Sequence, residues 1–106
     1  QKGREFAILT DEITKAWTGL STREYKQVKS LKKENLRDHM TNMELVLNML
    51  AEATTTEISR QKKPEGFDEN KEIAQQGGAI AGNTRKEIEA KSGKPIITSK
   101  NAKQIK

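Results

Sequence analysis

The side chains that could carry catalysis are few and lie apart. His39 is the single histidine, and the chain has no cysteine, so neither a disulfide nor a thiolate metal site can form. No serine, cysteine or aspartate arrangement around His39 is typical of a catalytic triad. Carboxylate pairs such as Glu69/Glu72 and Glu87/Glu89 are typical of charged helices and lack a second catalytic partner at a recognisable spacing. We therefore predict that the chain is not an enzyme and holds neither a metal nor a cofactor.

Two adjacent glycines, Gly77 and Gly78, lie inside a segment with a helical pattern. They do not form a phosphate loop, because no strand precedes them and no Gly-Lys-Ser/Thr sequence follows. A glycine inside a helix costs about 1 kcal/mol relative to alanine, so a compensating interaction is expected. We predict that Gly77 and Gly78 are packing positions, where another helix approaches a face of small side chains. A kink or the close approach of a ligand is the alternative.

Two clusters of basic side chains could contact nucleic-acid phosphates. The residues that we predict to do so are Arg23, Lys26, Lys29, Lys32, Lys33, Arg85 and Lys86. Four further lysines would extend the second cluster, namely Lys91, Lys94, Lys100 and Lys103. The alternative is that these side chains are solvated or pair with acids such as Glu34, Asp38 and Glu44.

The four aromatic residues argue against base stacking. Phe6, Trp17, Tyr25 and Phe67 all have the spacing of core or helix-start positions, which leaves no stacking platform. Residues 4–30 could still form a helix-turn-helix, with Gly19 in the turn. Many helical hairpins share that pattern without binding DNA.

The first half of the chain predicts three helical segments. Apolar residues repeat at helical spacing over residues 4–18, and Gly19 is a natural stop. Ser21 and Glu24 form a capping box that opens a short helix, with Tyr25, Val28 and Leu31 as its buried positions. Residues 34–40 should add a turn of helix around Leu36 and Met40.

The second half predicts two longer helices. A second capping box, Thr41 to Glu44, opens a core helix that ends near Gln61. Its buried stripe is predicted to contain Met43, Val46, Leu47, Leu50, Ala53, Thr54 and Ile58, widened by Leu45 and Met49. Asp68 is the expected N-cap of a helix over residues 69–91, with Phe67 as its hydrophobic staple.

The chain should end beyond a clear stop signal. Gly93 is the expected C-cap, and Pro95 prevents the helix from continuing. Ile96 and Ile97 can pack back on the core. Thr98 or Ser99 would then cap a last turn over residues 100–105, in a basic tail (98–106) that we expect to be flexible.

Composition indicates a single helical domain with an uneven charge. The 106 residues carry a net charge of +5, and 33% of them are charged. Residues 1–33 carry eight Lys/Arg against four acids, residues 34–74 five against nine, and residues 75–106 seven against two. We predict an all-α, compact bundle of about four to five helices spanning residues 1–106. Because the chain begins at Gln1, we expect it to be cut from a longer protein, and the lack of cysteine fits a cytoplasmic location.

Two segments together resemble a known family. They are residues 5–59, beginning EFAILTDEITKAW, and residues 77–102, GGAIAGNTRKEIEAKSGKPIITSKNA. Both resemble the C-terminal region of bacterial BRO-family (prophage antirepressor-like) proteins, and the second is also similar to the damage-inducible protein D group. The resemblance implies a missing N-terminal DNA-binding domain and supplies no catalytic residues to carry over.

Two functions follow as hypotheses. The first is an accessory domain of a prophage-type DNA-binding regulator, which contributes oligomerisation or non-specific DNA contacts. The second, which the damage-inducible group implies, is a protein-interaction module acting on a repressor or on the recombinase of the DNA-damage response. Neither hypothesis involves a membrane, because no apolar run approaches the length of about 20 residues that spans a bilayer.

Overall fold

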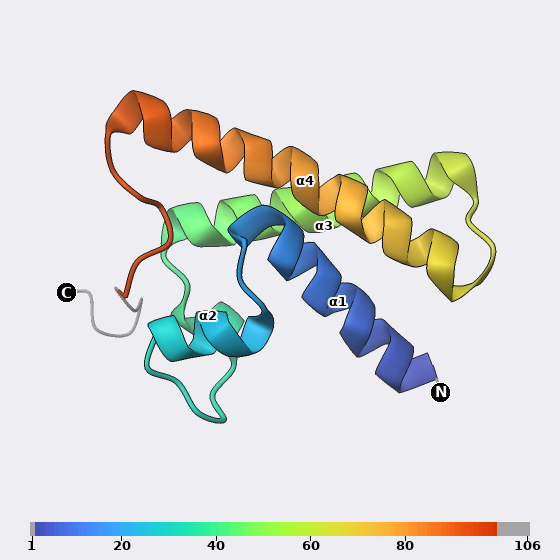
Figure 1. Ribbon diagram of the computed structural model, residues 1–106, viewed down its shortest axis with the longest axis horizontal. Helices are drawn as coiled ribbons and strands as arrows, with labels where there is room; N and C mark the ends of the chain where they lie inside the picture. The colour runs from blue at the N-terminus through green and yellow to red at the C-terminus, as the bar shows by residue number, and fades with distance from the viewer. Residues whose placement is uncertain (1, 100–106) are drawn as a thin grey trace.

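The structure is a computed structural model that describes residues 2–99. Within this range the chain forms the helices α1 (Lys2–Thr18), α2 (Thr22–Val28), α3 (Asn42–Lys62) and α4 (Gly66–Ser92), and a short 3-10 helix, η1 (Leu36–His39). The described part of the chain contains no strand, so the predicted all-α fold is confirmed. In Figure 1, α3 and α4 run alongside each other, α1 packs on α4, and α2 with η1 lies at one end. None of these helices is long and apolar enough to span a membrane.

A face of small residues lets α4 approach both of its neighbours. A Cβ atom built on Gly77 would lie 2.7 Å from the Cα of Thr55, and one built on Gly78 would lie 2.5 Å from the Cβ of Ala16. Non-bonded carbon atoms do not approach each other this closely, so only glycine fits without a shift of the backbone. Because α4 runs unbroken from Gly66 to Ser92, close packing rather than a break in the helix explains the two glycines.

The ends of the helices follow local signals that the sequence predicted. The Ser21 hydroxyl accepts a hydrogen bond from the Glu24 amide at 3.1 Å, and the Glu24 carboxylate accepts one from the Ser21 amide at 2.8 Å. Gly19 and Gly93 adopt left-handed conformations, with φ of 80° and 75°. These conformations end α1 and α4, because a residue with a Cβ atom adopts them only at a steric cost.

The core gathers around one tryptophan. The rings of Trp17 and Tyr25, both fully buried, meet edge to face with their centroids 6.1 Å apart. The indole N–H of Trp17 donates to the Oδ1 of Asn48 at 3.2 Å, which connects α1 to α3. Ile96 and Ile97 pack on this core after α4 ends, as predicted.

The predicted buried face of α3 is confirmed at Leu47 and wrong at several other positions. Glu44, Leu47, Asn48 and Ala51 are buried, whereas most of the predicted stripe lies half-buried or exposed. The exposed members of the predicted set are Met43, Val46, Met49 and Ala53. Compared with the prediction, α3 turns a different face inward, because its polar side chains Glu44 and Asn48 bond to buried partners on other segments. Hydrophobic periodicity does not reveal such partners.

Two helix-start predictions and one aromatic prediction are also wrong. Phe6, predicted in the core, is 72% exposed. Helix α4 begins at Gly66 with Glu65 as N-cap, so Asp68 is not the N-cap and Phe67 is not the staple residue before it. The Glu65 amide donates instead to the Glu69 carboxylate at 2.8 Å. The last turn predicted over residues 100–105 lies outside the described residues.

Candidate binding cleft

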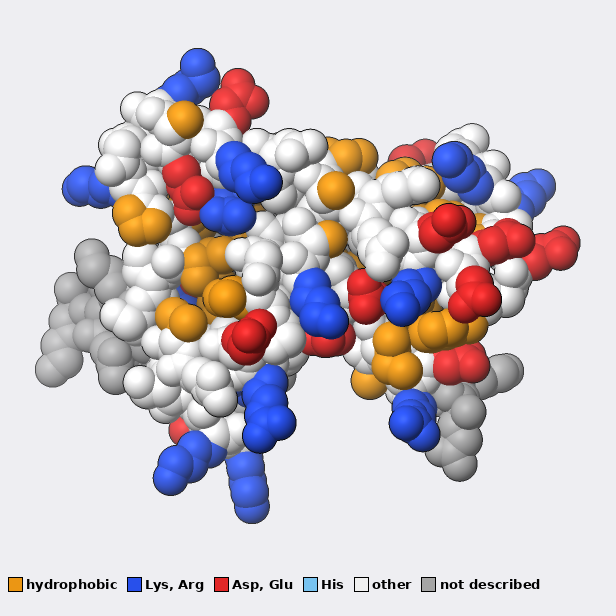
Figure 2. All heavy atoms as spheres, viewed as in Figure 1, with side chains coloured by type: hydrophobic (Ala, Val, Ile, Leu, Met, Phe, Trp, Pro, Cys, Tyr) orange, Lys and Arg blue, Asp and Glu red, His pale blue; other side chains and the backbone are white. Residues whose placement is uncertain are grey.

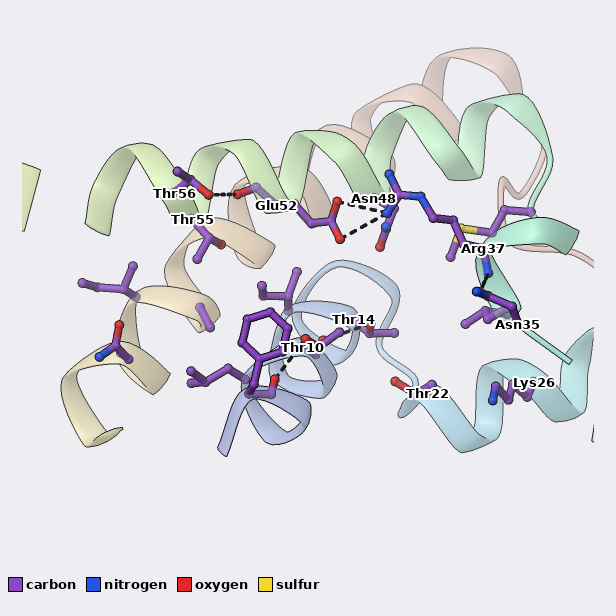
Figure 3. A pocket seen from close by; sticks show the side chains of 18 of the residues that line it. Thr10, Thr14, Thr22, Lys26, Asn35, Arg37, Asn48, Glu52, Thr55 and Thr56 are labelled. Atoms are coloured by element: carbon purple, nitrogen blue, oxygen red, sulfur yellow. Dashed lines mark hydrogen bonds and ion pairs between the residues drawn. The ribbon is translucent and has the colours of Figure 1, made fainter. Parts of the chain in front are cut away.

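A cleft of about 740 Å³ separates α1 from α3 (Figure 3). Both helices pack on α4, but they diverge toward the N-terminus of α1, as Figure 1 shows. The first half of α4, with Ile73 and Ala74, closes one end and the floor of the cleft, and α2 with η1 closes the other end. The cleft is therefore a consequence of how three helices meet.

One wall of the cleft is apolar and belongs to α1. Phe6, Leu9 and Ile13 line it at a spacing of three and four residues, which places them on one face of the helix. Phe6 is the most exposed large hydrophobic side chain among the described residues. Removing an apolar ring from water lowers the free energy, so this wall is suited to contact a partner.

The opposite wall is polar and belongs to α3. Asn48, Glu52, Thr55 and Thr56 line it. The Thr56 hydroxyl donates to the backbone carbonyl of Glu52 at 3.0 Å, in the same helix. Since that proton is used within α3, the hydroxyl oxygen is left to accept a hydrogen bond from a ligand.

Basic side chains collect at the end of the cleft that α2 and η1 form. Lys26, Lys33 and Arg37 line this end, and Arg23 and Lys32 line an adjoining hollow on the α2 side. Figure 2 shows Lys and Arg side chains projecting from the region that α2 and the loop after it occupy. The cleft thus changes from apolar to cationic along its length.

Local hydrogen bonds orient this cationic end. The backbone amide of Thr22 donates to the Oδ1 of Asp11 at 2.8 Å, which fixes the start of α2 against α1. The amides of Lys32 and Lys33 donate to the Glu34 carboxylate at 2.8 and 3.0 Å. These amide hydrogen bonds lower the pKa of Glu34. With its carboxylate turned to the backbone, Glu34 holds the turn that carries the two exposed lysines.

One ion pair crosses the cationic end. The Nη1 of Arg37 lies 3.1 Å from the Oε1 and 3.3 Å from the Oε2 of Glu52. Both side chains remain nearly half exposed. An exposed pair of this kind contributes little to stability, so a ligand carboxylate can compete for the guanidinium.

The residues predicted to bind nucleic acid do not form one surface. Arg23, Lys32 and Lys33 are exposed, and Lys26 is half-buried. Lys29 is buried and its Nζ lies 2.6 Å from the Oε1 of Glu44, so its assignment as a phosphate contact is wrong.

Arg85, Lys86 and Lys91 of the second predicted cluster lie on α4, away from α2 (Figure 1), whereas Lys100 and Lys103 lie outside the described residues. Arg85 donates through Nε to the backbone carbonyl of Trp17 at 2.8 Å and pairs with Glu89 at 2.9 Å. The side chain is only 15% exposed, so Arg85 holds α4 against α1. Lys86 is exposed beside it. The two clusters are therefore separate surfaces.

Two residues of the cleft were not predicted as binding residues. Phe6 was predicted in the core, and the sequence predicted no role for Arg37. Arg37 lies in η1, two residues after the Asn35 N-cap. Its position at the cleft depends on how η1 and α3 are arranged in space, which no local pattern predicts. For Lys29, the i, i+4 spacing from Tyr25 was the available signal, because it puts both residues on one face of a helix.

Residues 2–99 contain no group of three or more His, Asp or Glu side chains placed to hold a metal ion. His39 is half-buried in η1. No protein-family model, curated protein or solved structure matches the chain.

Proposed function

We propose that this chain is a non-catalytic accessory domain of a DNA-binding regulator, the class that its resemblance implies, and that it binds a protein partner in the cleft between α1 and α3. The observation that carries the proposal is the exposed apolar wall of that cleft. Grooves with such walls accept helical segments of partner proteins through anchors spaced three and four residues apart. Phe6, Leu9 and Ile13 form a continuous apolar strip along one face of α1, on which such anchors can pack.

The shape of the cleft favours a chain segment over a small molecule. Its volume of about 740 Å³ would suffice for either. The wall residue Phe6, however, is 72% exposed, so this side of the cleft is open to solvent, whereas pockets for small molecules bury most of the ligand surface. An extended opening with one apolar side suits an elongated partner.

A peptide selection tests this proposal. The chain would be screened against a random peptide library displayed on phage, with the Phe6→Ser variant as the counter-target. The matched control is Ile80→Ser, because Ile80 is also an exposed apolar residue of a helix but lies outside the cleft. We expect peptides that bind the wild type and Ile80→Ser and bind Phe6→Ser at least about tenfold more weakly. If every recovered peptide binds all three proteins equally, the cleft is not the binding site.

A second candidate function is non-specific DNA binding by the cations around α2. It is favoured by the exposure of Arg23, Lys32 and Lys33 on neighbouring turns. Removal of two phosphate contacts should flatten the dependence of log affinity on log salt by about two units. We therefore expect this change in Lys32→Ala/Lys33→Ala and no change in Lys62→Ala/Lys71→Ala, which removes the same charge outside both predicted clusters. Equal slopes in all three proteins would leave these lysines without a role in DNA binding.

Oligomerisation is the remaining contribution that the sequence left open. Three apolar side chains of α3, Met43, Val46 and Met49, are between 41% and 51% exposed. If they form a contact between copies, Val46→Glu should shift the sedimentation equilibrium toward the monomer. A wild-type chain that remains monomeric at high concentration would exclude this contribution.

A further inference from the structure

The charges along the cleft specify the kind of partner that it would accept. At the α2 end, Lys26, Lys33 and Arg37 all reach the same opening. Among the described residues that line the cleft, Glu52 is the one carboxylate, and Arg37 already contacts it. The opening therefore has a surplus of positive charge that the protein itself does not neutralise.

The apolar part of the cleft limits what can carry the complementary negative charge. Phe6, Leu9 and Ile13 lie within residues 6–13 of α1, or about 10 Å of helix. A nucleic acid would place phosphates along this apolar stretch and gain nothing from it, because phosphate affinity depends on basic contacts. A helix with one apolar face would cover the stretch and bury its aromatic ring.

We infer that the cleft binds an acidic amphipathic helix, whose apolar face packs on Phe6, Leu9 and Ile13 and whose carboxylates pair with Lys26, Lys33 and Arg37. This inference rests on the proposed function and adds the chemistry of the partner to it. A carboxylate of the partner replaces Glu52 at Arg37, since the Arg37–Glu52 pair is exposed to solvent. Glu52 therefore competes with the partner and weakens its binding.

Because Glu52 competes with the partner for Arg37, removing its charge should improve binding. Glu52→Gln removes the competing charge and keeps the shape of the side chain, so an acidic peptide should bind a few-fold more tightly. Lys26→Glu/Lys33→Glu should weaken the same peptide by at least about tenfold. The matched control, Lys62→Glu/Lys91→Glu, changes the net charge equally at positions outside the cleft and should have a much smaller effect.

The test uses the peptides that bind the wild-type chain and not Phe6→Ser. Their affinities would be measured by fluorescence anisotropy at several salt concentrations, and their helicity by circular dichroism in the free and bound states. We expect sequences with a net negative charge, helix formation on binding, and the opposite responses to Glu52→Gln and Lys26→Glu/Lys33→Glu.

Several results would overturn the inference. If the cleft-dependent peptides are neutral or basic, or are unaffected by both sets of variants, the partner is not acidic, although the proposed function stands. Displacement of the peptides by an equal concentration of duplex DNA at physiological salt would assign the cations to nucleic acid instead. A selection that yields no cleft-dependent peptide removes the proposed function, and this inference with it.

Discussion

The side-chain ammonium of Lys29 lies 2.6 Å from the Oε1 of Glu44, and both side chains are completely buried. The same carboxylate accepts hydrogen bonds from the Tyr25 hydroxyl and, at 2.8 Å, from the backbone amide of Thr41. A buried ion pair is tolerated when its geometry and additional hydrogen bonds offset the loss of hydration. Glu44 thus connects α2 to the start of α3 and orients the cationic end of the cleft.

The Lys29–Glu44 pair should matter more for stability than an exposed pair does. Glu44→Gln removes the charged carboxylate that pairs with the buried ammonium of Lys29, so we expect a loss of about 3–5 kcal/mol in the free energy of unfolding. Lys29→Met/Glu44→Gln should lose less than the sum of the two single variants. Urea denaturation followed by the fluorescence of Trp17, the single tryptophan, would measure these values.

The exposed pair provides the control for this comparison. Arg37→Gln/Glu52→Gln removes an ion pair whose side chains are 45% and 43% exposed, and it should change stability by less than about 1 kcal/mol. If Glu44→Gln also changes the free energy of unfolding by less than about 1 kcal/mol, Lys29 is not held in the core.

Stability should fall at alkaline pH because of Tyr25. Burial, and then the hydrogen bond to Glu44, raises the pKa of Tyr25 above its ordinary value of 10.0. Because the pKa of Tyr25 is higher in the folded state, the stability that neutral Tyr25 contributes is complete below about pH 10 and is lost as the pH rises further. The loss should reach about 1.4 kcal/mol per pH unit.

A Tyr25→Phe variant isolates this effect, because Tyr25 is the single tyrosine. The difference in unfolding free energy between the wild type and Tyr25→Phe should shrink as the pH rises past 10. Phenolate absorbance should develop in the wild type only as the chain unfolds. Its appearance in a chain that is still folded would show that Tyr25 is accessible to solvent.

The glycines of α4 should not tolerate alanine. Gly77→Ala places a methyl group against the backbone of Thr55, and Gly78→Ala places one against Ala16. Overpacking of this kind costs about 1–3 kcal/mol, which exceeds the gain from helix propensity. Gly3 has open space around it, so Gly3→Ala should be neutral or slightly stabilising. Thermal unfolding that ranks Gly77→Ala and Gly78→Ala above the wild type would contradict the close contacts.

Truncations along α3 should reveal which of its faces is buried. Leu47 is 1% exposed and Val46 is 51% exposed. Leu47→Ala should therefore cost about 2–5 kcal/mol and Val46→Ala less than about 1 kcal/mol. Leu50, once expected in the core, is half-buried, and its truncation should fall between the two. Chemical denaturation that gives Val46→Ala a loss as large as that of Leu47→Ala would show that Val46 is buried, as the sequence predicted.

Removal of the Thr55 hydroxyl should not destabilise the chain. Its Oγ1 is buried without a hydrogen-bond partner, directly against Gly77. A buried polar atom without a partner loses its hydration and gains nothing in return. Thr55→Val should therefore raise the free energy of unfolding by about 1 kcal/mol. A loss of stability in the same denaturation assay would indicate that the hydroxyl has a partner in solution.

The sequence by itself determined the helices and most of their ends. The Ser21–Glu24 capping box and the terminal glycines Gly19 and Gly93 act within one turn of the backbone. Such signals are complete in a short window of sequence, so they could be read directly. The small-residue face of α4 was visible in the same way, because glycine inside a helix requires compensation from packing.

Only the tertiary structure decided which face of α3 is buried and where a ligand could bind. Glu44 and Asn48 face inward because they meet Lys29, 15 residues away in the chain, and Trp17, 31 residues away. Burial of a polar group depends on whether a partner satisfies it, and these partners lie on other helices. The cleft likewise exists because α1 and α3 both pack on α4 and diverge from each other, a relation between helices that no local pattern encodes.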